Sequence, residues 1–122
     1  MNFNELRYSY DEEYDIMYCR INESYDYDYT IPATPFFNID ISKNKKVVAF
    51  ELLDASHVFG LIKNDLKDNP KVKITVQVTS DVIKIVFNIL TRKGDVGSYF
   101  KKVLNENNVN DGVFYYNIMN WA

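Results

Sequence analysis

The chain has 122 residues and is 47% hydrophobic, with 4 glycines and 3 prolines; this composition excludes wholesale disorder and predicts a single domain, residues 1–122, with one core. Its formal net charge of −3 and its single cysteine exclude a strongly basic protein and an internal disulfide. The sequence shows no signal-peptide pattern and no apolar run of the ~20 residues that span a bilayer, so we expect a cytoplasmic protein without membrane contact.

Four strands are predicted in the first half from the alternation of apolar and polar side chains. They span residues 6–10, 15–21, 37–41 and 47–53. The last is apolar on both faces, which indicates a central strand. Residues 22–34 alternate tyrosine with aspartate in part, and this segment can extend as an edge strand or stay a loop.

A helix is predicted after the fourth strand. Asp54 or Ser56 can accept a hydrogen bond from the free N–H groups of its first turn. The helix ends at Asn69–Pro70 because proline disfavours helical backbone in the residue before it. One apolar stripe with helical spacing supports the prediction, formed by Val58, Phe59, Ile62 and Leu66.

The second half opens with a hairpin of strands 71–78 and 82–90. A short helix capped by Asp95 or Ser98 is expected next, and a last strand over 113–119. The order β-β-β-β-α-β-β-α-β predicts an α+β fold with a mostly antiparallel sheet. Residues 70–122 can extend the first sheet or form a second layer. The helix expected between the hairpin and the last strand carries on one side Tyr99, Phe100, Val103 and Leu104.

A broken signature runs through the first half of the chain. It consists of Tyr10–Asp11 with Asp15 and Tyr18, then Ile39–Asp40, then the run Glu51–Ser56. By these motifs, residues 6–62 resemble the YuzE-like family of small uncharacterised proteins. The chain departs from the pattern at Ser42–Lys46 and at Ala49, where that family commonly has glycine.

The resemblance implies a β-β-β-β-α unit over residues 6–66. The β-β-α-β extension over 70–122 lies outside the family core and rests on the residue pattern alone. The resemblance also implies a short intracellular protein without assigned chemistry. Similar small proteins are often suspected of acting beside a toxin-like partner, so the resemblance makes an antitoxin-like role an expectation.

The carboxylates of the signature are the candidates for chemistry. A metal-dependent, acid-based enzyme requires Asp11, Asp15, Asp40 and Glu51 to converge. The EF-hand spacing is absent, however, and no lysine closely follows Glu51. The alternative is a solvated hairpin tip, with Asp15 paired to Arg7 or Arg20. We therefore assign no catalytic residue, metal ligand or cofactor, and keep the enzyme as an alternative.

Nucleic-acid binding is a second alternative, which requires the basic residues to form a continuous stripe. With a pI of about 5.1, the chain as a whole repels phosphate, and scattered solubilising positions are the favoured interpretation. We therefore do not expect a nucleic-acid partner. The basic residues concerned are Lys43, Lys45, Lys46, Lys71, Lys73, Arg92, Lys93, Lys101 and Lys102.

The first 30 residues concentrate negative charge and tyrosine. They hold two arginines against eight Asp and Glu, a net charge of −6, together with seven of the ten tyrosines. Aromatic-rich exposed surfaces favour protein interfaces. Such an acidic row can also mimic a nucleic-acid backbone, and an exposed strand edge can support a homodimer. We predict a non-catalytic protein-binding module whose contacts are Leu6, Tyr8, Tyr18, Tyr25, Asp26, Tyr27, Asp28 and Tyr29.

Overall fold

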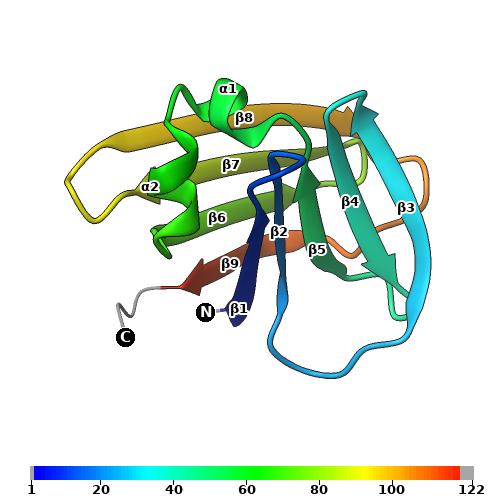
Figure 1. The fold of residues 1–122 in the computed structure, drawn as a ribbon. Helices are drawn as coiled ribbons and strands as arrows, with labels where there is room; N and C mark the ends of the chain where they lie inside the picture. The colour runs from blue at the N-terminus through cyan, green and yellow to red at the C-terminus, as the bar shows by residue number, and fades with distance from the viewer. Residues whose placement is uncertain (1, 119–122) are drawn as a thin grey trace.

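The computed structural model describes residues 2–118, and these are 59% strand and 9% helix (Figure 1). The α+β prediction is therefore wrong, because one continuous sheet makes up nearly the whole protein. Within the described residues the elements are β1 (Asn2–Asp11), β2 (Ile16–Ile21), β3 (Tyr27–Thr34), β4 (Phe37–Ser42), β5 (Val47–Leu52), α1 (Ala55–Phe59), α2 (Lys63–Lys67), β6 (Lys71–Val78), β7 (Val82–Leu90), β8 (Val96–Leu104) and β9 (Gly112–Ile118).

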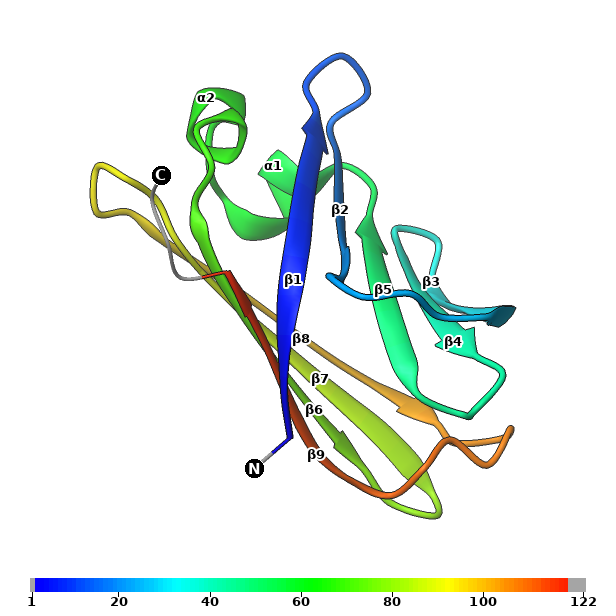
Figure 2. The same ribbon diagram turned by 90° about the horizontal axis from the view of Figure 1, so that it is seen from below.

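The nine strands follow one another across the sheet in the order β3-β4-β5-β2-β1-β9-β6-β7-β8. Every neighbouring pair is antiparallel except β1 and β9, which are parallel. The sheet bends so that β6–β9 lie opposite β1–β5, which gives a nearly closed, barrel-like shape (Figure 2). Residues 70–118 thus extend the first sheet and also form the layer that faces it.

The core fills the space between the two layers. On most strands, apolar side chains alternate with exposed ones, as in β6 and β7, where every second residue is buried. β5 is buried on both faces, which confirms its central position. Aromatic rings join the layers in edge-to-face pairs, with ring centroids 5.5 Å apart for Phe37 and Phe87 and 5.1 Å apart for Phe50 and Tyr116.

The helix predicted near residues 95–104 is wrong, because this segment is strand β8. Each of its residues pairs with one residue of β7, from Val96 opposite Leu90 to Leu104 opposite Val82. The spacing of the apolar residues fits a helix in isolation, but the long partner strand provides hydrogen bonds along the whole segment.

The helix predicted after Asp54 forms only in two short pieces. α1 ends at Gly60, whose left-handed backbone (φ +65°) is typical of a helix end, and α2 begins three residues later. Neither of the two helices in residues 2–118 is long and apolar enough to cross a membrane. They cover one end of the sheet, with α1 against β8 and α2 against β1 (Figure 1).

The remaining segments follow the prediction more closely. Of the two possibilities for residues 22–34, the edge strand is realised from Tyr27, after a loop. The last strand, predicted over 113–119, is β9, and Met119 lies outside the described residues.

Candidate functional site

The signature residues meet where the β1–β2 hairpin contacts the start of α1. The side chain of Asp15 accepts hydrogen bonds from the Tyr10 hydroxyl and from both the backbone N–H and the hydroxyl of Ser56. Its backbone carbonyl also accepts from the N–H of Ala55, at 3.0 Å. We call Tyr10, Asp15 and Ser56 the hairpin–helix network. It provides the first turn of α1 with acceptors from a segment about 40 residues away.

This network replaces the predicted cap. Asp54 occupies the cap position with a left-handed backbone (φ 55°), and its side chain makes no capping hydrogen bond. Ser56 lies within α1, one residue after its start, and donates its hydroxyl to Asp15 at 2.6 Å, so it is not the cap residue of this helix. The predicted pairing of Asp15 with an arginine is also wrong, because the side chain of Asp15 is engaged by Tyr10 and Ser56 and Arg7 donates to Asn22.

Burial and hydrogen bonding oppose each other at Asp15. Burial alone raises the pKa of this carboxyl, since it disfavours the charged form. The hydrogen bonds from Ser56 and Tyr10, together with the charge of Lys63, outweigh burial and hold the pKa below its usual value. Asp15 is therefore a charged carboxylate at neutral pH, and its hydrogen bonds with Tyr10 and Ser56 have a structural role.

The other carboxylates of the acid-based enzyme alternative have separate partners. Asp11 accepts from the N–H of Tyr14 in the hairpin turn, Asp40 from the hydroxyl of Thr30, and Glu51 from the amide of Asn38. Within residues 2–118, no three His, Cys, Asp or Glu side chains are grouped closely enough to hold a metal ion. Among the described residues, the carboxylates that the enzyme alternative requires therefore do not converge on one shared centre.

Cys19 lies fully buried in the core, on the β2 face that points toward β6–β9. Burial raises the pKa of its thiol to about 12, so the reactive thiolate is scarce at neutral pH. The burial of Cys19 therefore indicates an inert thiol that packs as a small apolar side chain.

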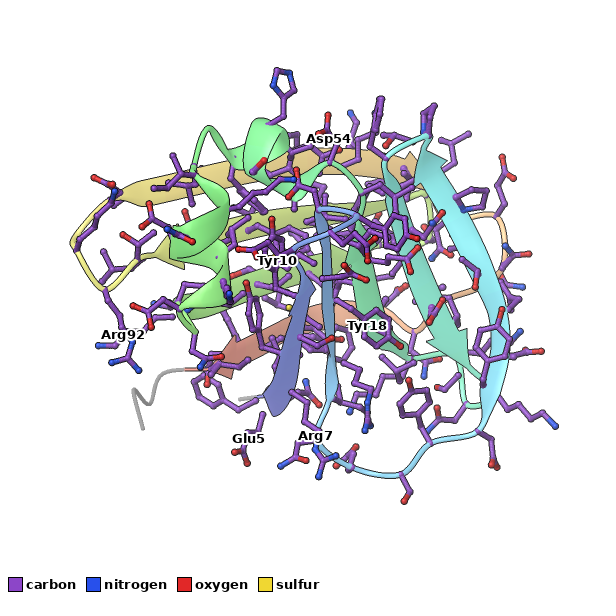
Figure 3. All side chains as sticks on the ribbon, viewed as in Figure 1. Glu5, Arg7, Tyr10, Tyr18, Asp54 and Arg92 are labelled. Carbon is purple, nitrogen blue, oxygen red and sulfur yellow. The ribbon has the colours of Figure 1, made fainter. Side chains whose placement is uncertain are left out.

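The predicted partner-binding residues fall into two groups. Tyr18 lies on the outer side of β2, Tyr25 and Asp26 lie on the loop between β2 and β3, and the start of β3 holds Tyr27, Asp28 and Tyr29. We call these six residues the tyrosine surface. Tyr18 is half-buried and hydrogen-bonds Tyr25; burial and this bond raise the pKa of Tyr18. Figure 3 shows the side chain of Tyr18 beside β5, its neighbouring strand.

Exposure differs within the tyrosine surface. Tyr27 is 53% exposed, and its hydroxyl forms a hydrogen bond with the hydroxyl of Thr30, at 2.7 Å. Tyr25 and Tyr29 are half-buried and pack against the core. The hydroxyl of Tyr29 is buried without a hydrogen-bond partner among the described residues. Tyr27 is therefore the tyrosine of this surface that a partner can reach most fully.

The second group consists of Leu6 and Tyr8, which lie on the face of β1 that points toward the core. Leu6 is buried, and the Tyr8 hydroxyl donates to the backbone carbonyl of Leu66 in α2 at 2.5 Å. Burial, and then the proximity of Cys19 and Tyr10, raise the pKa of Tyr8. These two side chains therefore help to hold strand and helix together, away from the tyrosine surface.

Lysines of the β4–β5 turn neutralise part of the acidic charge. Lys45 lies 3.8 Å from the carboxylate of Asp28 and 5.4 Å from the centre of the Tyr29 ring. Lys46 lies 3.6 Å from Glu23. The sequence alone did not predict that the turn with these lysines lies against the tyrosine-rich segment.

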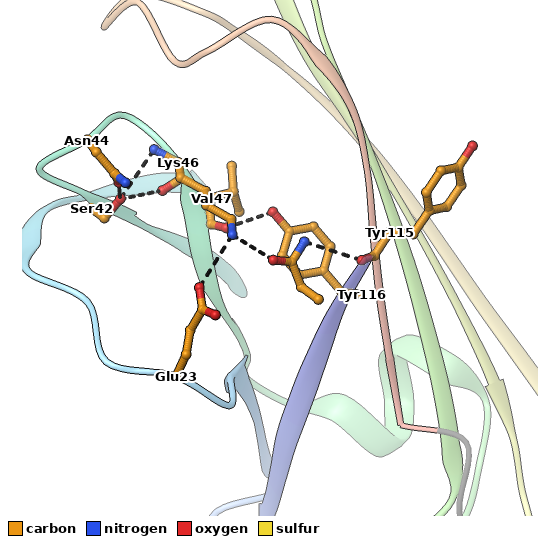
Figure 4. A network of polar contacts seen from close by, with 8 residues as sticks. Glu23, Ser42, Asn44, Lys46, Val47, Tyr115 and Tyr116 are labelled. Carbon is orange, nitrogen blue, oxygen red and sulfur yellow. Dashed lines mark hydrogen bonds and ion pairs between the residues drawn. The ribbon is translucent and has the colours of Figure 1, made fainter. Parts of the chain in front are cut away.

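A polar network supports the end of the molecule away from the helices (Figure 4). The Lys46 ammonium donates to Asn4 at 2.6 Å, and the Asn4 amide donates to the carbonyl of Tyr115 at 3.3 Å. The Tyr116 hydroxyl donates to the carbonyl of Val47 at 2.7 Å. The network therefore joins the β4–β5 turn to β1 and β9.

An open cavity of about 480 Å³ lies beside this network and borders the tyrosine surface. Its lining is mixed, with carboxylates and lysines around an apolar floor. The residues that line it are Ile21, Glu23, Ser24, Tyr25, Asp26, Ser42, Lys43, Asn44, Lys46 and Val48. A cavity of this size beside exposed aromatic residues can receive a side chain of a partner protein.

Comparison with known proteins finds one match for this chain, to a family model. Neither the curated proteins nor the solved structures contain a significant match to it. Residues 7–56 do match a family model, and this segment includes the whole hairpin–helix network. The family model that residues 7–56 match is described as "Protein of unknown function (DUF2283)".

Proposed function

We propose that the protein is a non-catalytic cytoplasmic module that binds a partner protein through the tyrosine surface. The observation that carries the proposal is the exposure of Tyr27 on an edge strand, beside the cavity lined by Tyr25 and Asp26. Tyrosine provides a large amphipathic contact area at a low cost in conformational entropy. The proposal also includes membership of the YuzE-like family and an antitoxin-like role.

The form of the surface favours a protein partner over nucleic-acid mimicry. A mimic of the nucleic-acid backbone needs a row of unpaired negative charges. Here Asp28 and Glu23 each have a lysine within 4 Å, so the charge is mixed. A mixed rim around aromatic anchors is typical of protein–protein interfaces.

The experiment that tests the proposal compares two single variants by affinity capture from a lysate of the source organism. Tyr27→Ala removes the exposed ring. Phe36→Ala is the matched control, because Phe36 is 52% exposed on the turn after the same strand but is not part of the tyrosine surface. Tyr29 is not chosen, because it packs against the core.

We expect one protein to be captured by the wild type and by Phe36→Ala, and to be lost with Tyr27→Ala. Both variants should unfold within about 0.5 kcal/mol of the wild type, since both side chains are at the surface. Capture that is equal with all three proteins, or that disappears after nuclease treatment, would contradict the proposal.

A further inference from the structure

The last four strands of the sheet carry an unusual charge pattern. β6, β7, β8 and β9 contain five lysines and no aspartate or glutamate. The chain as a whole has a net charge of −3. Positive charge is therefore concentrated on one layer of an acidic protein.

The strand register places three of these lysines on the outer, exposed side of that layer. Lys73 and Lys84 alternate with buried residues, and the exposed Lys102 alternates with half-buried ones. Lys84 lies directly opposite Lys102 on the neighbouring strand. No ion pair joins any of the three to an acid within residues 2–118. Like charges directly opposite one another are destabilising. A bound anion would remove this repulsion.

Aromatic side chains lie on the same side of the layer. Phe100 is 57% exposed and stands in the row between Lys102 and Ser98 on β8. Phe3 is 63% exposed and contacts Tyr115, with ring centroids 5.6 Å apart. Across the sheet the register connects these rings through one continuous row, namely Phe3, Tyr115, Thr75, Val86 and Phe100.

We propose that this outer side of β6–β9, with Phe3 of β1, binds single-stranded nucleic acid; we call it the lysine face. Lysines would neutralise phosphates, and the exposed rings would stack on unpaired bases. Phe3 and Phe100 are four strand spacings apart, roughly 19 Å, so one strand crossing the sheet can meet both rings. The proposal uses a different face from the tyrosine surface and is independent of the proposed function.

Two observations favour nucleic acid over a protein partner on this face. Lysine is depleted in protein–protein interfaces. The lysine face, in contrast, holds three lysines that form no ion pair with any acid in the part of the chain that the structure describes. Rows of polar residues flank the aromatic row, with Lys73, Asn88 and Ser98 on one side and Gln77, Lys84 and Lys102 on the other. The aromatic row is thus bordered on both sides by hydrogen-bonding groups, which suits bases and phosphates. Exposed apolar residues lie beyond these rows, at Leu90, Val96 and Leu104.

The test is fluorescence anisotropy with a labelled oligonucleotide of about 20 thymidines, longer than the roughly 4–16 nucleotides that a single small domain covers. We expect binding at low salt. With three phosphates neutralised, a fourfold rise in salt concentration should weaken binding about 20-fold.

Two variants test whether the lysine face is the surface that binds the oligonucleotide. Lys84→Gln with Lys102→Gln should reduce that salt effect to about threefold. Phe100→Ala should weaken binding about 5- to 150-fold, since one stacked base is lost. The matched controls are Lys93→Gln, whose lysine is paired with Asp65 and Asp95 in a turn, and Phe36→Ala; both should bind like the wild type. Circular dichroism would verify that all variants are folded.

Three outcomes would overturn the proposal. One is the absence of binding at low salt. Another is equal binding of heparin or of duplex DNA with no effect of Phe100→Ala, which would indicate a general attraction of polyanions. The third concerns the Lys84→Gln, Lys102→Gln variant. If this variant no longer captures an acidic protein but still binds the oligonucleotide, the lysine face is a protein interface.

Discussion

At the scale of single residues, Asp15 connects two distant parts of the first half of the chain. It is 7% exposed and accepts hydrogen bonds from the hairpin residue Tyr10 and from Ser56 at the start of α1. The sequence predicts that Asp15 and Ser56 belong to one signature. Their contact could not be predicted, because no local pattern relates residues so far apart.

Replacing Asp15 by asparagine should lower the free energy of unfolding by about 2–3 kcal/mol at neutral pH, because hydrogen bonds to a charged group are lost. Since the pKa of Asp15 is lowered in the folded state, its stabilisation is present above the unfolded pKa and is lost as pH falls through the folded pKa. The difference between wild type and Asp15→Asn should therefore shrink near pH 3.

Urea unfolding at the two pH values would measure this difference. Asp81→Asn is the control, because Asp81 is exposed in a turn, and it should stay within about 0.5 kcal/mol of the wild type. An equal difference for Asp15→Asn at both pH values would show that the charge of Asp15 is not the source of the effect.

At the scale of elements, local patterns predicted most strands but failed at β8. The 71–78 and 82–90 hairpin is as predicted, because its alternation is strict and its turn is short. In β8, Tyr99, Phe100, Val103 and Leu104 fit a helical spacing equally well. Only the pairing with β7, a property of the folded sheet, decides between the two.

Gly97 of β8 provides a test of this assignment. A Cβ atom at this position would lie 3.0 Å from the Cβ of Phe59 and 3.0 Å from Cδ1 of Leu61, because β8 passes directly against α1 and the residues after it. Gly97→Ala should therefore destabilise the protein by about 1–3 kcal/mol through overpacking. Its exposed neighbour gives the control, Ser98→Ala, which should change stability by no more than about 0.5 kcal/mol. Equal stability of the two variants would show that α1 does not pack closely on β8.

At the scale of the whole molecule, the two halves share one core. Phe87 of β7 contacts Phe37 and Phe50 of the first half, with ring centroids 5.5 and 5.6 Å apart. β1 pairs with β9 along four residues. The sequence predicted separate units over 6–66 and 70–122 within one domain, but it did not indicate that each provides half of the same core.

A fragment of residues 1–69 should therefore not fold alone. Without β6–β9, the apolar inner face of β1–β5 would be exposed to water, and too little area would be buried to offset the loss of chain entropy. Thermal unfolding followed by circular dichroism should show a cooperative transition for the full chain and none for the fragment. A cooperative transition in the fragment would instead show an independent N-terminal unit.

The parallel pairing of β1 with β9 has a consequence for biosynthesis. β2 is made directly after β1, but β9, the other neighbour of β1, is made only after β2–β8. At translation rates of about 5–20 residues per second, that edge stays open for several seconds. During this time the nascent chain presents an unpaired edge and half a core, which is the state that chaperones recognise.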